Sequence, residues 1–218
     1  MVTMELTYYG HSCFKVKTKD LVLVIDPFDP NKLGIKLPKL EADVLLLTHD
    51  HFDHSYKAGV SGYRLLIDGP GEYELSGVDI VGIPVDHDEE HGSVRGKNTM
   101  YYIESEGVSV LHCGDLGHEL DDATLAKFGE VTALLLPIGG VYTIGPEQAA
   151  KVVSSIEPSF VVPMHYKIDG SKIADLGTLA KFLDEMGVDA QNGTKLDKLK
   201  LSSSDSELET KVVVLERQ

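Results

Sequence analysis

The residues best suited to chemistry are gathered in one short stretch that directly follows the apolar run Val44–Leu47. Six consecutive positions there hold four potential metal ligands: His49, His51, Asp53 and His54. Imidazole is a neutral, borderline-soft donor, whereas carboxylate is a hard anionic donor. Both types side by side would suit two neighbouring divalent ions. The alternative is a solvated loop that is rich in histidine by chance, and we disfavour it because histidine is an uncommon residue.

These ligands are expected on a loop at the end of a strand. The run Val44–Leu47 is short and wholly apolar, which is typical of a buried strand. Ligands that share one face of a helix are spaced three or four residues apart. His49 and His51 are only two positions apart, so the sequence predicts a loop that leaves the strand rather than a helix.

Three later apolar runs also lead into potential ligands, at His87, Asp115 and His165. His91 competes with His87, but we favour His87 because it lies nearest the strand end, where the backbone is fixed. His91 is then expected in a solvated loop. A carboxylate at Asp115 would suit a bridging position, because its two oxygens can hold two cations and offset part of their charge. The sequence therefore predicts that separate strand ends converge to cage a pair of cations.

The stretch His49–His54 resembles the HxHxDH signature of the metallo-β-lactamase superfamily, and the later strand ends fill the remaining ligand positions in family order. That superfamily has an αββα sandwich fold and usually a hydrolytic site with one or two metals. The resemblance implies two divalent metal ions held by seven residues: His49, His51 and His87 on the first, Asp53, His54 and His165 on the second, and Asp115 between them. It also implies that Asp26 braces the ligand loop, although a simple turn residue before a proline is an equal alternative.

Several short sequence segments resemble those of one branch of that superfamily, the small hydrolases similar to L-ascorbate-6-phosphate lactonase. Two of them are Gly-Asp-Leu-Gly-His at residues 114–118 and Pro-Met-His-Tyr at residues 163–166. The branch implies hydrolysis of a small lactone, another ester or a phosphoester. Two cations about 3.5–4 Å apart can lower the pKa of a shared water from 15.7 towards about 7, and the bridged hydroxide would attack the substrate. Asp53, which could orient that water, and Asp115 are the expected catalytic residues.

Ligation by nitrogen and oxygen alone permits zinc, manganese or iron, of which we expect zinc. His51 stands where flavodiiron relatives carry glutamate, which argues against redox chemistry. No G-x-S-x-G motif is present for a serine nucleophile. Two alternatives to a lactone or ester hydrolase stay open. One is a phosphodiesterase that acts on a small or cyclic nucleotide, and the other is a non-catalytic metal-binding module of the same fold.

The residues that would contact a substrate are less clear than the ligands. Five residues near the ends of these motifs could hold an anionic group: Arg95, Asn98, Tyr142, Tyr166 and Lys167. Each could equally be an ordinary surface or hinge residue. His112 and His118 are not part of the minimal ligand pattern of the family. Each could face the substrate, support a metal ligand or be purely structural. His11 lies in a predicted turn between two strands and receives no role.

Composition narrows the class of partner. The chain has 218 residues and a net charge of −15, and it shows no cluster of lysine or arginine. A protein that binds nucleic acid normally presents a basic face. We therefore expect a small-molecule substrate, with an anionic group permitted, and no long nucleic acid. Local metals and a few cations would have to attract an anion to so acidic a protein.

The two cysteines, Cys13 and Cys113, are far apart and neither belongs to a C-x-x-C motif. This pattern fits a reducing cytoplasm better than a disulfide framework. The chain begins without a basic segment that leads into an apolar one, so no signal peptide is expected. No run approaches about 20 apolar residues, so no transmembrane helix or membrane partner is expected. The oligomeric state is not indicated.

The elements that must position the ligands form an alternating α/β pattern. We expect one domain over residues 1–218, an α/β protein with a four-layer αββα sandwich and mixed sheets. Helices are predicted at residues 120–128, 145–156 and 176–186. An exposed connection is predicted at residues 29–40, and a strand is predicted at residues 195–201.

Overall fold

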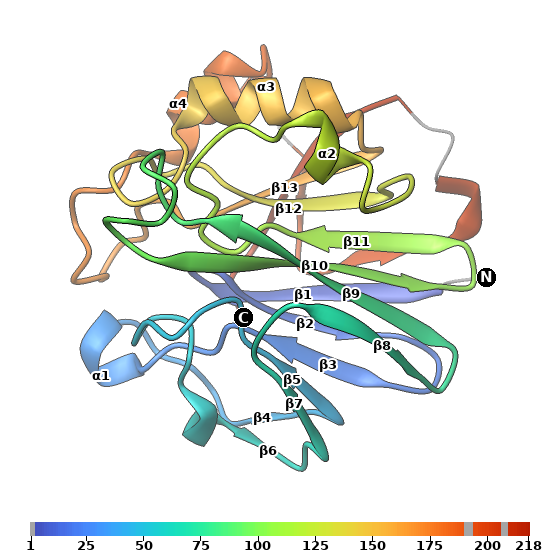
Figure 1. Cartoon of the computed structure of the whole chain (residues 1–218). Coiled ribbons are helices and arrows are strands. Elements are labelled where there is room, and N and C mark those ends of the chain that lie inside the picture. The colour runs from blue at the N-terminus through green and yellow to red at the C-terminus, as the bar shows by residue number, and fades with distance from the viewer. Residues whose placement is uncertain (1–2, 190–193, 206–208) are drawn as a thin grey trace.

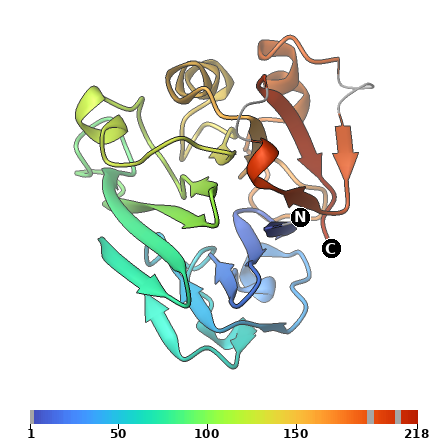
Figure 2. The same ribbon diagram turned by 90° about the vertical axis from the view of Figure 1, so that its right-hand side faces the viewer.

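The computed structural model describes residues 3–189, 194–205 and 209–218. Two β-sheets face each other within these ranges, and the longer helices lie over the outer face of one of them (Figure 1). Figure 2 views the same arrangement after a quarter turn, with the helices on one side of the sheets.

The first sheet has six strands and the second has eight. The order in the first sheet is β15 (Leu199–Leu201), β1 (Met4–Gly10), β2 (Cys13–Lys17), β3 (Val22–Ile25), β5 (Val44–Leu46) and β7 (Leu65–Ile67). The order in the second sheet is β14 (Thr194–Leu196), β16 (Lys211–Leu215), β13 (Phe160–Met164), β12 (Ala133–Pro137), β11 (Val108–His112), β10 (Lys97–Ser105), β9 (Val78–Asp86) and β8 (Gly71–Leu75). A small third sheet pairs β4 (Leu40–Glu41) with β6 (Val60–Ser61).

Strands of the second sheet are apolar on both faces because both faces are covered. In β12, Ala133 and Leu135 belong to the central core between the two large sheets. The alternating residues Leu134 and Leu136 belong to a second core under the helices. Side chains alternate between the two faces of a strand, so a strand buried on both sides appears as a continuous apolar run. This explains the apolar stretches in the sequence that precede the potential ligands.

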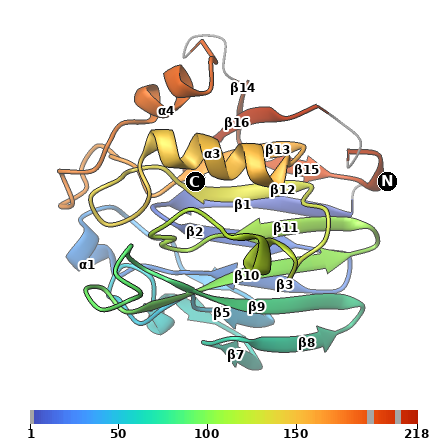
Figure 3. The ribbon, with the colours of Figure 1, turned by 45° about the horizontal axis from the view of Figure 1, so that its top comes forward.

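Three apolar cores separate four layers. The helices α3 (Pro146–Ile156) and α4 (Leu179–Glu185) lie over the second sheet, as Figure 3 shows. The outer layer on the first sheet is thinner and contains α1 (Pro30–Leu33), the β4–β6 pair and connecting loops. The predicted α/β sandwich with mixed sheets is therefore confirmed, with most of its helical cover on one side.

Two predicted helices are shorter than expected. The helix predicted at residues 120–128 is only α2 (Asp122–Leu125). It starts at Asp122 because the Asp121 side chain accepts from the backbone N–H of Thr124 and caps that end. The helix predicted at residues 176–186 begins at Leu179. The N–H of Gly177 donates to Gly139 instead, and its carbonyl accepts from Lys167. Those contacts hold residue 177 against neighbouring loops rather than in a helical turn.

Two other predictions are corrected. The segment at residues 29–40 is not simply exposed, because α1 forms there and buries Leu33 in the core outside the first sheet. Asp29 caps that helix by accepting from the N–H of Asn31. The strand predicted at residues 195–201 is two strands in different sheets. β14 pairs with β16, while β15 pairs with β1.

Parallel strands bring the potential ligands to one edge of the sandwich. β3, β5 and β7 are parallel neighbours in the first sheet. β11, β12 and β13 are parallel neighbours in the second. β9 runs antiparallel to β10, which runs antiparallel to β11, so β9 and β11 end at the same edge. The loops that follow β9, β12 and β13 gather at the left of Figure 1. No helix in the described part of the chain is long and apolar enough to cross a membrane.

Candidate metal centre

A buried carboxylate fixes the start of the histidine-rich loop. Asp26, which follows β3, accepts hydrogen bonds from the backbone N–H of Thr48 at 2.8 Å and from its hydroxyl at 2.6 Å. The same carboxylate lies 2.8 Å from Nδ1 of His54 and accepts its proton. This hydrogen bond orients the ring so that Nε2 of His54 is the nitrogen available to a metal ion, which is the usual arrangement behind a metal-binding histidine. The contacts fit the bracing role expected of Asp26.

Three histidines from two loops form a first group. The ring centroids of His49 and His51 are 4.5 Å apart. The ring of His87 lies 4.8 Å from that of His49 and 5.2 Å from that of His51. One ring nitrogen from each residue lies within 4.8 Å of the other two. Three imidazoles at this spacing could hold one divalent metal ion.

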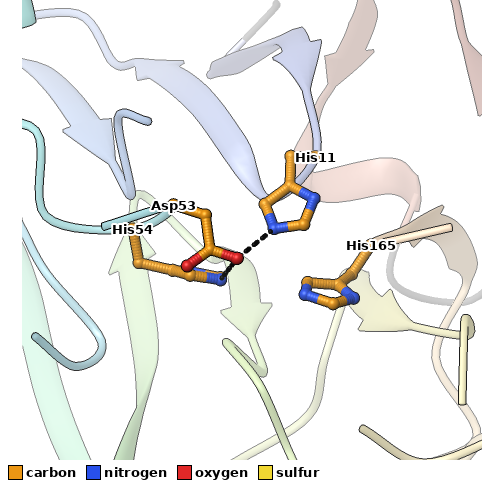
Figure 4. A group of neighbouring side chains, drawn as sticks. All are labelled: His11, Asp53, His54 and His165. Atoms are coloured by element: carbon orange, nitrogen blue, oxygen red, sulfur yellow. Dashed lines mark hydrogen bonds and ion pairs between the residues drawn. The ribbon is translucent and has the colours of Figure 1, made fainter. Parts of the chain in front are cut away.

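Four buried residues form a second group, shown in Figure 4: His11, Asp53, His54 and His165. Their ligand atoms also lie within 4.8 Å of one another. Three of the four were predicted from the sequence to share a metal. His11 was not, because it lies in the turn between β1 and β2 and not at the end of an apolar run into the site. The only signal in the sequence was a histidine directly after a glycine in a tight turn.

The carboxylate of Asp115 lies between the two groups. Its Oδ1 is 3.2 Å from Nε2 of His54. Its Oδ2 is 3.2 Å from Nε2 of His165 and 3.4 Å from Nε2 of His87. One side chain therefore contacts members of both groups. A carboxylate placed in this way could bridge two metal ions, so the bridging role of Asp115 stays a prediction.

Buried nitrogen and oxygen atoms at this site lack hydrogen-bond partners within the described residues. They are Nε2 of His49, Nε2 of His54, Nδ1 of His87, Oδ1 of Asp115 and both ring nitrogens of His165. Leaving such atoms unpaired is costly, and native proteins rarely do so without a reason. Ligand atoms about 2.1 Å from a tetrahedral metal are separated by about 3.4 Å, which matches the spacings around Asp115. The donor set therefore fits divalent metal ions.

The buried carboxylates of the cluster give it a negative charge that favours the binding of cations. Asp26, Asp53 and Asp115 are buried, and in the described ranges their ion-pair partners are histidines, with no lysine or arginine among them. Burial alone would raise the pKa of Asp115, but the imidazoles of His165 and His54 hold it well below its usual value. Burial would likewise lower the pKa of His54, yet the surrounding carboxylates raise it well above its usual value. A positive charge is therefore strongly favoured here.

Other imidazoles are held in the neutral form that binds metals. Burial, reinforced by His54, lowers the pKa of His49 to about 3. Burial and the neighbouring His165 lower the pKa of His11 to about 4. Burial also lowers the pKa of His87. Because a metal-binding imidazole must be deprotonated, these side chains can bind a cation at neutral pH without first losing a proton.

Asn98 and His112, whose roles the sequence left open, hold neighbouring loops in place through hydrogen bonds. Asn98 is buried, donates to the carbonyl of Cys113 at 2.8 Å and accepts from the N–H of Asp115 at 3.1 Å, so it holds the Asp115 loop in place. Nε2 of His112 donates to the carbonyl of Ser12, and its Nδ1 accepts from Gly114. That ring is structural.

The remaining two histidines do not join the cluster. Nε2 of His118 accepts from the N–H of Asp86, and its Nδ1 donates to the carbonyl of Glu119. His91 is 97% exposed, whereas His87 is buried within the first group. The structure thus places His87, and not His91, among the potential ligands.

Two glycines let neighbouring loops reach the ligands. A Cβ atom on Gly117 would overlap the peptide between His87 and Asp88, and one on Gly139 would overlap the carbonyl of His165. Because glycine lacks that atom, the loops after β11 and β12 can lie directly against two potential ligands. The segment that supplies Asp115 therefore also supports His87.

A cavity of about 440 Å³ opens over the cluster. Its lining combines cluster residues with larger side chains around them: Asp50, His51, Phe52, Asp53, His87, Arg95, Asp115, Tyr142, His165 and Ile173. Of the residues that the sequence left open as possible substrate contacts, Arg95 and Tyr142 line it, whereas Tyr166 and Lys167 do not. The site is therefore accessible to a small molecule.

Asp88 shapes the loop that brings Arg95 to this cavity. Its carboxylate accepts four backbone N–H groups at 2.7–3.1 Å, from Glu90, Gly92, Val94 and Arg95. Desolvation alone would raise the pKa of Asp88, but these donors outweigh it and lower the pKa. The Arg95 guanidinium then donates to the carbonyl of Val141 at 2.9 Å and lies 5.5 Å from the centre of the Tyr142 ring. Arg95 is thus held at the rim by contacts at both ends.

Comparison with known proteins identifies the class. The sequence model described as the Beta-lactamase superfamily domain matches residues 5–165. The chain therefore belongs to the metallo-β-lactamase superfamily, as its motifs predicted. Within that superfamily, it resembles a Methanopyrus kandleri protein named a metal-dependent hydrolase. The two are 30% identical over 218 aligned residues, which cover 86% of this chain and 95% of the relative.

Solved structures agree with this assignment. A Thermotoga maritima protein, named a zinc-dependent hydrolase of the metallo-β-lactamase superfamily, is 34% identical with a TM-score of 0.77. The match covers 98% of this chain and 100% of that one. A metallo hydrolase of Ignicoccus hospitalis is 27% identical with a TM-score of 0.60, over 75% of this chain and 83% of that one. These names give no substrate, so the similarity to ascorbate-6-phosphate lactonase stays a prediction.

Proposed function

We propose that this chain, a metal-dependent hydrolase of the metallo-β-lactamase superfamily, uses two divalent metal ions, most readily zinc, to cleave a small lactone, another ester or a phosphoester. The observation that carries the proposal is the position of Asp115 between two groups of potential ligands, in which buried ring nitrogens of His49, His54, His87 and His165 have no hydrogen-bond partner among the described residues. His49, His51 and His87 would hold the first ion, and Asp53, His54 and His165 would hold the second.

The side chains around the cavity would have different roles in hydrolysis. Bound divalent ions supply an activated water and polarise the attacked carbonyl or phosphoryl oxygen. Burial raises the pKa of Asp53, but His54 and His11 outweigh it and keep this carboxylate ionised, so it can accept a hydrogen bond that orients the attacking water. Asp26 accepts a hydrogen bond from Nδ1 of His54, which orients the ring so that Nε2 faces Asp115 and is the nitrogen that would bind a metal ion.

The rim supports a small substrate with an apolar part and an anionic group. Phe52, Tyr142 and Ile173 present apolar surface to the cavity, and Phe52 is 43% exposed. Arg95 brings a positive charge to the same cavity. An arginine fork can bind a carboxylate or phosphate through two parallel hydrogen bonds. At about 440 Å³, the cavity lies within the usual range for small-molecule sites, about 300–1,000 Å³.

The proposal extends to partners and compartment. The acidic net charge of −15 disfavours long nucleic acid. Both cysteines are free and buried, which supports a reducing compartment such as the cytoplasm. A phosphodiesterase acting on a small or cyclic nucleotide is the second candidate, since Arg95 and the apolar rim would also suit a phosphate attached to a base.

The test is a substrate panel run on metal-free protein, on metal-restored protein and on the variant His51→Ala. The panel contains lactones, carboxylic esters, phosphomonoesters and cyclic phosphodiesters. We expect turnover of a lactone, ester or phosphoester that chelation abolishes and zinc or manganese restores, with His51→Ala nearly inactive. Preference for cyclic phosphodiesters would favour the second candidate. No turnover by fully metal-loaded protein would contradict a hydrolase and indicate a binding module.

Arg95→Met should separate charged from neutral substrates of that panel. The variant keeps a long side chain but removes the charge. A hydrogen bond to a charged group contributes about 1.5–3 kcal/mol, so KM should rise about 10- to 100-fold for anionic substrates while neutral analogues change little. Steady-state kinetics on matched pairs of substrates measure this. Arg64→Met, at an exposed arginine paired with Asp43, serves as the control. Equal effects on anionic and neutral substrates would contradict the assigned role.

A further inference from the structure

His11 occupies a position that the two-metal proposal does not yet use. It lies in the turn between β1 and β2, is 2% exposed and belongs to the second group of potential ligands (Figure 4). We propose that His11 is a protein ligand of the second metal ion, together with Asp53, His54 and His165. The inference rests on the proposed two-metal function and adds a ligand to it.

The spacing of the side chains supports ligation. Nε2 of His11 lies 3.1 Å from Oδ2 of Asp53. The ring centroid of His11 is 4.1 Å from that of His165 and 5.2 Å from that of His54. Figure 4 shows Asp53 and His54 side by side, with His11 above them and His165 on the opposite side of the group. Two ligand atoms of one metal, each about 2.1 Å from it, lie about 3–3.4 Å apart, and the His11–Asp53 distance falls in this range.

The backbone holds His11 and His165 in matching conformations. His11 has a φ of 55° and His165 has a φ of 51°, both in the left-handed region that residues other than glycine seldom adopt. The N–H of His165 donates to the carbonyl of His11 at 2.9 Å, and the hydroxyl of Tyr8 donates to the same carbonyl at 3.1 Å. Such strain persists only where surrounding contacts enforce it, and it clusters at functional sites. Here the hydrogen bond between the two residues joins the loop that carries His11 to the loop that carries His165.

A purely supporting role for His11 would show a different geometry. Asp26 supports His54 from behind, through the ring nitrogen that faces away from Asp115. His11 instead stands beside Asp53, and its ligand atom lies within 4.8 Å of those of His54 and His165 as well as of Asp53. A residue that only oriented Asp53 would not need to approach the other two ligands. The arrangement therefore favours a ligand over a hydrogen-bond donor.

Two variants distinguish the roles. In His11→Gln, the amide nitrogen takes roughly the place of Nε2 and can still donate to Asp53. In that orientation the amide offers no nitrogen lone pair to a divalent ion, and its oxygen is a weaker ligand for cobalt(II) than an imidazole nitrogen. His11→Ala removes both abilities. Metal-free wild-type protein and both variants are titrated with cobalt(II), following the visible absorption of the bound ion and the affinity in competition with a chelator. Circular dichroism confirms that each variant is folded.

We expect both variants to bind the first cobalt ion within about threefold of wild type. The second ion should bind at least about 100-fold more weakly, since even partners outside the ligand set cost about 10- to 100-fold. The absorption of the second ion should also change in wavelength and intensity. If His11→Gln binds both ions like wild type, His11 is not a ligand, and loss of both ions to the same extent would also overturn the inference.

Failure of this inference is distinguishable from failure of the proposed function. Wild-type protein that binds two cobalt ions and hydrolyses no substrate would contradict the hydrolase, while weak second-ion binding in the variants would still support His11 as a ligand. Conversely, active protein with unchanged metal binding in His11→Gln would leave the hydrolase intact and remove His11 from the ligand set.

Discussion

Replacing Asp115 by asparagine should lower kcat/KM by at least about 1,000-fold, which corresponds to about 4 kcal/mol of transition-state stabilisation. The physical reason is the position of this carboxylate, whose two oxygens lie 3.2–3.4 Å from imidazole nitrogens of His54, His87 and His165. An amide is neutral and offers one oxygen and one NH₂ group. It cannot bind two cations, so the variant should also retain at most one metal ion per chain.

Metal analysis and steady-state kinetics on the purified variant measure both effects. Asp122→Asn is a suitable control, because Asp122 follows the same segment but is exposed at the start of α2. The control should keep the activity and metal content of the wild type. An Asp115→Asn protein with two metals and more than about a tenth of wild-type activity would show that Asp115 does not bridge them.

The second large effect is expected on stability. Asp26→Ala removes the acceptor for three buried donors, the N–H and hydroxyl of Thr48 and Nδ1 of His54. An unsatisfied buried donor costs about 1–3 kcal/mol, and the Thr48 hydroxyl can turn to Nδ1 of His49, 2.9 Å away. We therefore expect metal-free protein to lose about 3–5 kcal/mol of the free energy of unfolding, a large part of the stability of an ordinary domain.

Urea unfolding of metal-free wild type and variant, followed by circular dichroism, measures this loss. Asp68→Ala is the matched control, because Asp68 follows the parallel strand β7 in the same sheet but its side chain is 60% exposed. The control should change stability by less than about 1 kcal/mol. If Asp26→Ala proves no less stable than Asp68→Ala, the buried hydrogen bonds around Asp26 do not stabilise the loop.

Strand ends were the part of the site that sequence alone could predict. Apolar runs of this length can be recognised as buried strands without a structure. A ligand that directly follows such a strand lies at the edge of the sheet, because the strand fixes the backbone there. His87, Asp115 and His165 were placed in this way, and the structure brings them together with the loop at residues 49–54. The superfamily resemblance supplied their order.

Residues whose positions depend on packing between the sheets could not be predicted. His11 lies in a hairpin turn of the first sheet, and contacts with Asp53 and with the His165 loop of the second sheet, which are distant in sequence, bring it into the site. Asn98 was left open from the sequence, as a possible substrate contact or an ordinary residue, and in the structure it is buried on β10 and accepts from the N–H of Asp115. The short α4 has the same origin, because Gly177 bonds to distant loops and not within its own segment.

The central claim is that imidazoles and carboxylates from separate strand ends cage two cations. Anomalous X-ray diffraction, recorded at the absorption edge of the metal on crystals of zinc- or manganese-loaded protein, tests it most directly. We predict two peaks about 3.5–4 Å apart, one among His49, His51 and His87 and one beside His54 and His165, with Asp115 touching both. A single peak, or two peaks with Asp115 bound to neither, would contradict the claim.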